Sequence, residues 1–491
     1  MQIILASSEV VPFAKTGGLA DVSGALPVEL EKLGHEVILF MPAYRQALEC
    51  GLECRDTALK FDLPVGAKLQ PGSLLESQLP DSNVKVYLVR QPDFFERDGL
   101  YGQDGEDYGD NCARFVFFCR AILESIRLLG LKPDLIHAND WQTGLIPAYL
   151  KTEFASLPVY EDISTLFTIH NLAYQGNFWH WDMLLTGMDW KHYNWREMEF
   201  HGNLNLLKTG LVFADKISTV SPTYAQEIQA ADQGCGLEGV LQDRSADLVG
   251  ILNGIDTTIW NPASDSHLTA NFDAEQWQAG KAECKRHLQE RLGLTQAPKL
   301  PLIGVVGRLA SQKGWSLILP VLKNWLENRD VQWAILGTGD RDYHAVLEAL
   351  NCSYPEKIAA KLEFSNELAH QIEAGADMFL MPSEYEPCGL NQMYSMAYGT
   401  VPVVRSTGGL ADTVVDCNVE NCANGTANGF RFEEFTSSAL ERCLERAVNR
   451  YLEDRETWAK LVRRGMTTDW SWTQSAQQYE SLYKKILDLP N

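Results

Sequence analysis

Two glycine-rich loops of this chain contain residues suited to binding phosphate. The hexapeptide Thr-Gly-Gly-Leu-Ala-Asp occurs at Thr16–Asp21 and again at Thr407–Asp412. Glycine allows a ligand to approach backbone N–H groups closely, and a helix N-terminus favours anions. Lys15 precedes the first copy, and the second copy has no such lysine. We therefore expect the first copy to hold a phosphate and the second to act differently. The alternative is that both are structural turns.

A second group of charged residues lies in the other half of the chain. Arg308 and Lys313 follow the apolar run Leu302–Val306. Two fixed cations near one loop can neutralise a departing diphosphate without a metal ion. Further on, Glu386 lies in the loop Glu384–Leu390, where carboxylates and a glycine turn suit a sugar and a phosphate. The alternatives are a solvated cation pair and a loop stiffened by proline.

Short aliphatic and β-branched runs alternate with helical patterns along the chain, which predicts an α/β fold with parallel sheets. In the first half we expect strands at Ile3–Ser7, Glu36–Met41, Lys85–Val89, Leu135–His137, Thr165–His170, Lys216–Val220 and Leu248–Leu252. In the second half we expect strands at Leu302–Val306, Gln332–Leu336, Met378–Met381 and Val401–Val404, and helices at Trp315–Asn328 and Gln392–Tyr398.

Four polar segments follow the carboxyl ends of these predicted strands, where open α/β sheets bind ligands. They are Ser7–Asp21, His137–Trp141, His170–Tyr174 and Ser383–Leu390. A single histidine is usually a structural residue. Several polar segments at the same edge of a sheet favour a functional site instead.

The chain is long enough for two large domains. Asn253–Asp256, followed by Trp260-Asn261-Pro262 and a polar stretch, is the predicted hinge. We expect one domain over residues 1–255 and a second over 256–468. The tail predicts an aromatic-rich amphipathic helix over 469–491 that joins the first domain and packs across both.

The charge balance disfavours polyanionic partners. The chain has 42 Lys and Arg against 65 Asp and Glu, a net charge of -23. This charge repels a nucleic-acid backbone or an anionic membrane, so we expect neither as a partner. No apolar stretch reaches the roughly 18 residues of a membrane span, and no signal peptide precedes the first strand. We expect a cytoplasmic protein, or one of the plastid stroma if a transit peptide has been removed.

Cysteine usage and short motifs argue against metals and dinucleotides. The 11 cysteines form no C-x-x-C pair, which favours reduced thiols over disulfides or zinc. Gly234–Gly239 matches G-x-G-x-x-G but follows a helical pattern instead of a strand. The triplet Asp340-Arg341-Asp342 is typical of a helix start and not of a metal site.

Five motifs, in order along nearly the whole chain, resemble those of the bacterial glycogen synthase and plant starch synthase family. They are Lys15-Thr16-Gly17-Gly18-Leu19-Ala20-Asp21, His170-Asn171, Leu252-Asn253-Gly254-Ile255-Asp256, Arg308-Leu309-x-x-Gln312-Lys313-Gly314 and Glu386-Pro387-Cys388-Gly389-Leu390. The resemblance implies a GT-B fold, in which two Rossmann-like parallel-sheet domains face a deep cleft. It also implies retaining, metal-independent transfer of glucose from ADP-glucose to the non-reducing end of an α-1,4-glucan, with no cofactor.

The resemblance also implies roles for individual residues. The catalytic set is His170 at the transferring glucose, Arg308 and Lys313 at the departing ADP, and Glu386 at the glucose hydroxyls. The implied donor contacts are Lys15, Gly17, Gly18, Asp21, Asn253, Phe364, Cys388, Gly389 and Leu390, with Phe364 as the adenine-stacking ring. The implied acceptor contacts are Glu9, Tyr101, Asp140 and Trp141.

The chain departs from the common pattern of the family at three positions of these loops. Glu384 replaces an arginine, Asn391 replaces a threonine, and Asn139 replaces the second histidine of His-x-His-Asp. Two other functions stay open from the residues alone. One is a glucan phosphorylase, which needs a lysine-bound pyridoxal phosphate, and the other is a silent glucan-binding or nucleotide-sugar-binding paralogue.

Overall fold

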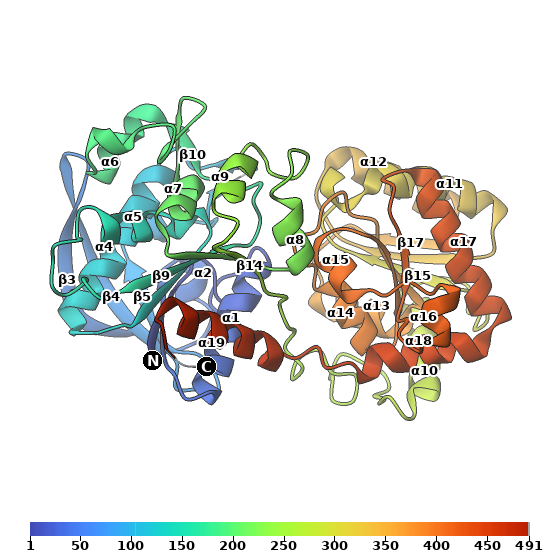
Figure 1. The fold of residues 1–491 in the computed structure, drawn as a ribbon. Helices are drawn as coiled ribbons and strands as arrows, with labels where there is room; N and C mark the ends of the chain where they lie inside the picture. The colour runs from blue at the N-terminus through green and yellow to red at the C-terminus, as the bar shows by residue number, and fades with distance from the viewer. Residues whose placement is uncertain (104, 490–491) are drawn as a thin grey trace. The chain divides into compact units, whose positions relative to one another are not determined.

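The computed structural model describes residues 1–103 and 105–489. These residues form two units, drawn in Figure 1. Unit 1 contains Met1–Gly254 together with the C-terminal residues from Trp472, and unit 2 contains Ile255–Ser471. The chain therefore passes from one unit to the other at the predicted hinge and returns just before its last helix.

The sheet of unit 1 runs in the order β14-β13-β9-β8-β1-β2-β5-β4-β3. From β14 to β5 all neighbours are parallel, whereas β4 and β3 are antiparallel additions. The chain builds β2 and β5 on one side of β1 and then returns to build β8, β9, β13 and β14 on the other side. The bounds are β1 Gln2–Ala6, β2 Glu36–Pro42, β3 Arg55–Val65, β4 Lys68–Gln78, β5 Lys85–Arg90, β8 Leu135–Asn139, β9 Ser164–Ile169, β13 Lys216–Thr219 and β14 Leu248–Gly250.

Helices connect the parallel strands of unit 1, as a crossover between parallel neighbours requires. In α1 the buried residues recur at helical spacing, so that one face packs on the sheet. The main helices are α1 Gly18–Lys32, α4 Asn111–Leu129, α5 Leu145–Lys151, α7 Leu206–Phe213, α8 Pro222–Glu227 and α9 Glu238–Asp243.

The C-terminal helix α19 (Trp472–Ile486) belongs to unit 1. Its buried Tyr483 hydroxyl lies 2.8 Å from Nδ1 of His137, whose Nε2 lies 2.6 Å from Thr168 Oγ1. Burial lowers the pKa of His137 to about 3, so the ring is a neutral structural link. The predicted helix over 469–491 thus begins later than expected, and its last two residues, 490 and 491, lie outside the described part. Within unit 1 its buried Tyr479 and Tyr483 lie against His137.

The sheet of unit 2 is parallel and runs in the order β17-β16-β15-β18-β19-β20. The chain again builds two strands on one side of the first strand and then crosses to the other side. The order therefore reverses between β15 and β18, as it does between β1 and β8 in unit 1. The bounds are β15 Leu302–Val306, β16 Gln332–Leu336, β17 Ile358–Lys361, β18 Met378–Met381, β19 Val401–Arg405 and β20 Phe430–Phe432.

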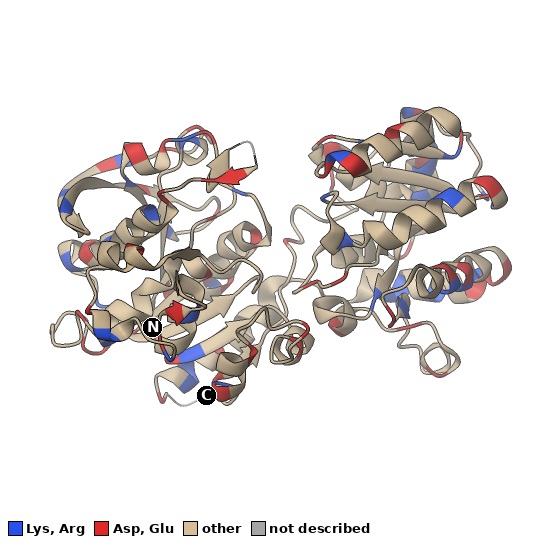
Figure 2. Cartoon of the chain, turned by 90° about the horizontal axis from the view of Figure 1, so that it is seen from above, with Lys and Arg blue, Asp and Glu red and all other residues tan. Residues whose placement is uncertain are grey.

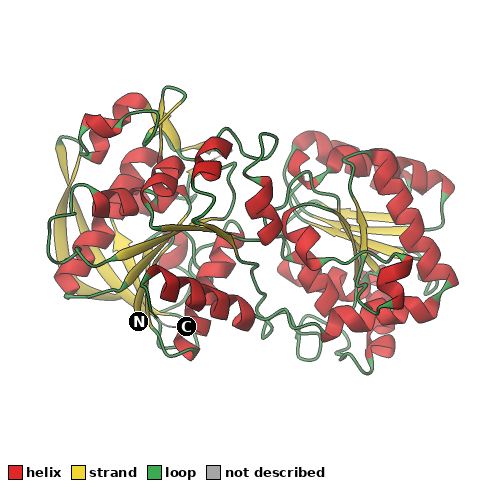
Figure 3. Cartoon of the chain, in the orientation of Figure 1, coloured by secondary structure: helices red, strands yellow, loops and turns green. Residues whose placement is uncertain are grey.

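Helices flank the sheet of unit 2 on both faces (Figure 3). Both faces of the strands are therefore buried, which explains their continuous apolar runs. Charged residues of both signs are mixed over the helices and loops of each unit (Figure 2). The helices are α10 Trp277–Leu292, α11 Trp315–Asn328, α12 Arg341–Ser353, α13 Asn366–Gly375, α14 Asn391–Ala397, α15 Gly408–Thr413, α16 Val419–Ala423, α17 Ser437–Glu453 and α18 Arg455–Thr467.

The strands predicted from apolar runs are confirmed, with ends that differ by one or two residues. The sequence analysis missed β3 and β4, because this hairpin alternates exposed and buried residues and contains prolines and charges. It also missed β17 and β20, which are only four and three residues long.

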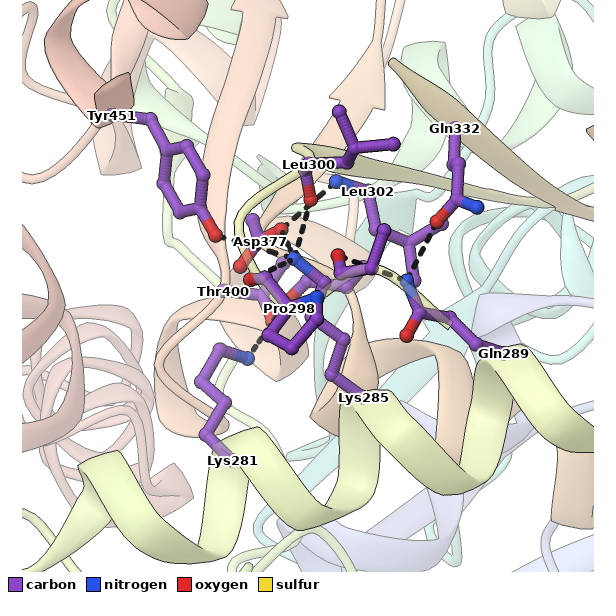
Figure 4. A network of polar contacts seen from close by, with 12 residues as sticks. Lys281, Lys285, Gln289, Pro298, Leu300, Leu302, Gln332, Asp377, Thr400 and Tyr451 are labelled. Carbon is purple, nitrogen blue, oxygen red and sulfur yellow. Dashed lines mark hydrogen bonds and ion pairs between the residues drawn. The ribbon is translucent and has the colours of Figure 1, made fainter. Parts of the chain in front are cut away.

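Two buried lysines of α10 tie the helices of unit 2 to its sheet (Figure 4). Lys285 Nζ lies 2.7 Å from Asp377 Oδ2 and also donates to Tyr451 and two backbone carbonyls. Burial alone would lower the pKa of Lys285, but attraction by Asp377 and Tyr451 raises it above its ordinary value. Lys281 donates to Thr400 and two carbonyls and has no paired carboxylate among the residues that the structure describes, and burial lowers its pKa to about 8.

We expect Asp377→Asn to destabilise unit 2 strongly. The change leaves the buried ammonium of Lys285 without its counter-charge, and breaking a buried pair costs about 3–5 kcal/mol. Chemical denaturation should show a loss of this size. As a control, Glu456→Gln breaks the exposed pair with Lys460 on α18 and should change the free energy of unfolding by less than about 1 kcal/mol. Equal, small losses of the free energy of unfolding in both variants would contradict the role of Asp377.

Candidate active site

The predicted site residues of unit 1 gather at the carboxyl ends of β1, β8 and β9, beside the point where the strand order reverses. Glu9 follows β1, Asp140 and Trp141 follow β8, and His170 follows β9. Because the three strands are adjacent and parallel, their following loops share one edge of the sheet. This is the position at which open α/β sheets bind ligands.

Glu9 binds the glycine turn that precedes α1. Its Oε2 accepts from the backbone N–H groups of Thr16 at 2.5 Å and Gly17 at 3.1 Å, and its Oε1 accepts from the Thr16 hydroxyl at 2.6 Å. The Tyr101 hydroxyl donates to the same Oε1 at 2.7 Å. The protein's own carboxylate thus occupies two amides that we expected to face a phosphate. Glu9, predicted as an acceptor contact, orders the turn.

The side chain that this turn presents is Lys15. Its Nζ lies 2.6 Å from Oδ1 of Asp21, in the first turn of α1, and both groups are partly exposed. A Cβ placed on Gly17 or Gly18 would meet no atom within 4 Å. A ligand therefore has open access to this stretch of backbone and to the Lys15 ammonium.

The half-buried Asp140 and the buried His170 form a hydrogen-bonded corner. Asp140 has φ 55° and ψ 178°, a conformation that is costly for a residue with a Cβ and is found mainly at functional sites. Its amide donates to Thr168 O, and its Oδ1 accepts from the His170 amide at 2.8 Å. Burial raises the pKa of Asp140 to about 7, so this carboxyl titrates near neutral pH.

The tautomer of His170 follows from Asn139. The Asn139 amide Nδ2 donates to the carbonyls of Ala6 and His137, which places Oδ1 2.9 Å from His170 Nε2. His170 Nε2 must therefore carry the proton. Burial lowers the pKa of His170 to about 3, so the ring is neutral at physiological pH.

Tyr101 and Trp141 belong to an aromatic cluster beneath these polar groups. The Trp141 ring lies 4.8 Å from Phe115, 6.4 Å from Tyr101 and 5.6 Å from Phe178, measured between centroids. Trp141 is buried, so most of its surface contacts protein. Asn253, which follows β14, is also buried, and its Oδ1 lacks a hydrogen-bond partner among the described residues.

In unit 2 a pocket of about 180 Å³ lies at the reversal point between β15 and β18. Its lining includes Arg308, Lys313, Glu386, Gly389 and Leu390, all of which the sequence analysis placed in the site. Lys313 Nζ lies 2.6 Å from Glu386 Oε2, and the Ser383 hydroxyl donates to the same oxygen at 2.9 Å. Lys313 is partly exposed and Glu386 is buried.

Gln312 connects the two loops of this pocket. Its Nε2 donates to Tyr385 O at 3.2 Å, its carbonyl accepts from the Glu384 amide at 2.8 Å, and its Oε1 accepts from Arg308 Nη2 at 3.3 Å. The sequence analysis named Gln312 in a motif and Ser383 in a polar segment, without giving either residue a role. Nothing in the type or the spacing of these two polar residues distinguished them in the sequence. Asn391, which departs from the family pattern, ties α14 to the end of β15 through Val306 O at 2.9 Å.

The second copy of the hexapeptide packs directly on the Glu386 loop. A Cβ on Gly408, whose φ is 45°, would lie 1.9 Å from Glu386 O, and one on Gly409 would lie 2.0 Å from Cys388 O. The Gly409 amide donates to the carbonyls of Glu386 and Pro387. The two copies therefore differ in their surroundings. The first has open glycines, and the glycines of the second allow the backbone to approach the Glu386 loop.

The sequence analysis also discussed Cys388, Phe364 and Asp340. Cys388 is buried beneath the second glycine turn. Phe364 follows β17 and is 90% exposed, and it is not among the residues that line the pocket. Asp340 caps α12 through the Asp342 amide, which confirms that this triplet begins a helix.

The described residues contain no cluster of three or more His, Cys, Asp or Glu able to hold a metal ion. None of their helices is long and apolar enough to span a bilayer.

Two family models match the chain, one in each unit. The model described as starch synthase catalytic domain matches residues 2–243. The model described as glycosyl transferases group 1 matches residues 290–465. The second match contains Arg308, Lys313 and Glu386.

Similar proteins cover the chain from end to end. A glycogen synthase of Rhodopirellula baltica is 46% identical, with 100% of this chain and 98% of the relative covered. A glycogen synthase of Syntrophotalea carbinolica is 47% identical, with 100% and 99% covered. The catalytic domain of starch synthase IV from Arabidopsis thaliana, solved with ADP and acarbose bound, is 34% identical with a TM-score of 0.90 and 99% of each chain covered. The chain belongs to the glycogen synthase and starch synthase family, with the GT-B fold.

Proposed function

We propose that this protein transfers glucose from ADP-glucose to the non-reducing end of an α-1,4-glucan with retention of configuration. The observation that carries the proposal is the pairing of Lys313 with Glu386 in a pocket at the strand-order reversal of unit 2. The bacterial relatives named glycogen synthase and the starch synthase solved with ADP and acarbose support this choice of substrates.

Transfer with retention needs two opposite charges to be stabilised together. Positive charge develops at the anomeric carbon, and negative charge develops on the departing diphosphate. We assign Arg308 and Lys313 to the diphosphate. Glu386 accepts from Lys313 and Ser383 through Oε2, which leaves Oε1 for a glucose hydroxyl.

Unit 1 would supply the remaining contacts. Lys15 would add a third cation for the donor phosphates, and the open space beside Gly17 and Gly18 would let them approach this ammonium. His170 is neutral, with its proton on Nε2. It would therefore contact the transferring glucose as a polar group without repelling the positive charge that develops there. The buried side-chain carbonyl oxygen of Asn253 has no hydrogen-bond partner in the described part of the chain, so it suits a ligand hydroxyl or amine.

We propose that the reaction needs neither a divalent metal nor another cofactor, because the three cations would supply the charge that a metal provides in other transferases. We place the reaction in the cytoplasm. In support, all 11 cysteines are free thiols, 6 of them buried, which fits a reducing compartment.

The direct test is incorporation of labelled glucose into glycogen. We expect transfer from ADP-glucose to exceed transfer from UDP-glucose, and EDTA to leave the rate unchanged. The absence of transfer from either donor would indicate a silent binding protein. Loss of rate with EDTA, restored by Mg²⁺ or Mn²⁺, would contradict the assignment of the cations.

Lys15→Gln should raise the Michaelis constant for ADP-glucose more than it lowers kcat. A point charge that faces a phosphate acts in the ground state and the transition state alike, so its loss weakens binding uniformly. We expect an increase of about tenfold, the equivalent of a charged contact worth roughly 1.5 kcal/mol. Lys32→Gln, at the other end of α1, is the matched control. An unchanged Michaelis constant for ADP-glucose in Lys15→Gln would mean that the first glycine turn is purely structural.

A further inference from the structure

A row of aromatic rings, three exposed indoles and one half-buried phenol, lies in unit 1 between β9 and α7. It consists of Trp179, Trp181, Trp190 and Tyr193, and we refer to it as the indole row. The three indoles are 62%, 48% and 39% exposed, respectively. Trp179 ends strand β10 (Asn177–Trp179), and Trp181 follows in a single 3₁₀ turn. Large exposed apolar patches on soluble proteins mark interaction sites.

The rings of the indole row form a continuous surface. Ring centroids lie 6.5 Å apart from Trp179 to Trp181, 5.5 Å from Trp181 to Trp190 and 5.4 Å from Trp190 to Tyr193. The interplanar angles lie between 66° and 73°, so the rings meet edge to face. The polar residues His180, Asp182, Lys191 and Asn194 are interspersed with them in the sequence.

Polar contacts hold the part of this segment that carries Trp190 and Tyr193. Lys208 is buried, and its Nζ donates to the carbonyls of Trp195 at 2.5 Å and Glu199 at 2.6 Å. Burial lowers the pKa of Lys208. His192 Nδ1 lies 2.9 Å from Glu197 Oε2, and the Asp189 side chain caps the turn that contains Trp190. An exposed loop anchored by a buried ammonium is preorganised, which lowers the entropic cost of binding a ligand.

The row is continuous with the site residues of unit 1. Successive residues of a strand point to opposite faces. In β10, Phe178 packs on Trp141 with centroids 5.6 Å apart, and Trp179 faces solvent. Trp141 in turn lies beside Tyr101, which bonds Glu9. A single short strand therefore connects the edge of the site to the indole row.

The chemistry of the row favours a neutral, hydroxyl-rich ligand. The net charge of -23 disfavours an anionic lipid surface or a nucleic acid. A glucose ring has an apolar C–H face that can stack on an indole and a rim of hydroxyls that can bond to the neighbouring polar groups. An α-1,4-glucan repeats this unit along its length, as the row repeats its rings.

We propose that the indole row is a second glucan-binding site, separate from the catalytic centre, that holds the acceptor polymer while its non-reducing end reacts. This inference rests on the proposed function for the identity of the polymer. Holding the chain at a second point raises the effective concentration of its ends at the catalytic centre.

The test separates glucan binding from turnover. Retardation of the protein in native gels that contain glycogen, without donor, reports binding alone. We expect the double variant Trp179→Ala/Trp181→Ala to bind glycogen about tenfold more weakly, the combined effect of two ring contacts. The ratio of its rate on glycogen to its rate on maltotriose should fall by a similar factor, because a second point of attachment benefits a polymer that is held there while its end reacts.

Leu69→Ala is the matched control, since Leu69 is an exposed apolar residue of unit 1 that lies on β4. It should bind glycogen as the wild type does. Calorimetry with β-cyclodextrin, a glucan ring without a non-reducing end, gives a second readout, and its binding should weaken in the double variant.

Unchanged retardation of the double variant, or an equal loss in Leu69→Ala, would overturn the inference. Tryptophan-dependent sedimentation with phosphatidylglycerol vesicles, without glycogen retardation, would also overturn it. If the wild type transferred no glucose but its retardation still depended on the two tryptophans, the proposed function would fail and the glucan site would stand.

Discussion

Close backbone contact around Glu386 is the constraint on which the site of unit 2 depends. Gly314, with φ 77°, fits against Pro382, where a Cβ would lie 2.1 Å from the carbonyl oxygen. Gly408 fits against Glu386 itself, where a Cβ would lie 1.9 Å from the carbonyl oxygen. These glycines bring the loops after β15, β18 and β19 together. Only then can Lys313, from the first loop, reach Glu386, from the second.

The same hexapeptide has different surroundings in the two units. In unit 2 its glycines have no free space, because they support the Glu386 loop. In unit 1 they are open, and Glu9 takes the amides of Thr16 and Gly17. An internal carboxylate fixes the turn and leaves the Lys15 ammonium partly exposed beside Asp21. The same hexapeptide therefore supports a neighbouring loop in unit 2 and has open space beside its glycines in unit 1.

Much of the fold could be predicted from the sequence, because parallel strands buried on both faces leave apolar runs such as Leu302–Val306, and polar loops follow their carboxyl ends. The charged members of the site could be predicted for the same reason. The hairpin β3–β4 could not, since its alternation is interrupted by Pro64 and Pro71. Glu9 as the partner of the glycine turn, Asn139 as the residue that sets the tautomer of His170, and Ser383 could not be predicted either. Their roles depend on contacts that only the folded loops create, and the indole row became visible only once exposure was known.

The most direct test of the account is a double-mutant cycle on Lys313 and Glu386, with kcat and the dissociation constant of ADP measured for each protein. We predict that Lys313→Gln and Glu386→Gln each lower kcat by about 10²- to 10³-fold, as loss of one transition-state stabiliser does. The double variant should lose much less than the product of the two effects, because the groups are in direct contact. If folded Glu386→Gln kept kcat within about threefold of the wild type, the pair would be structural and the central claim would be wrong.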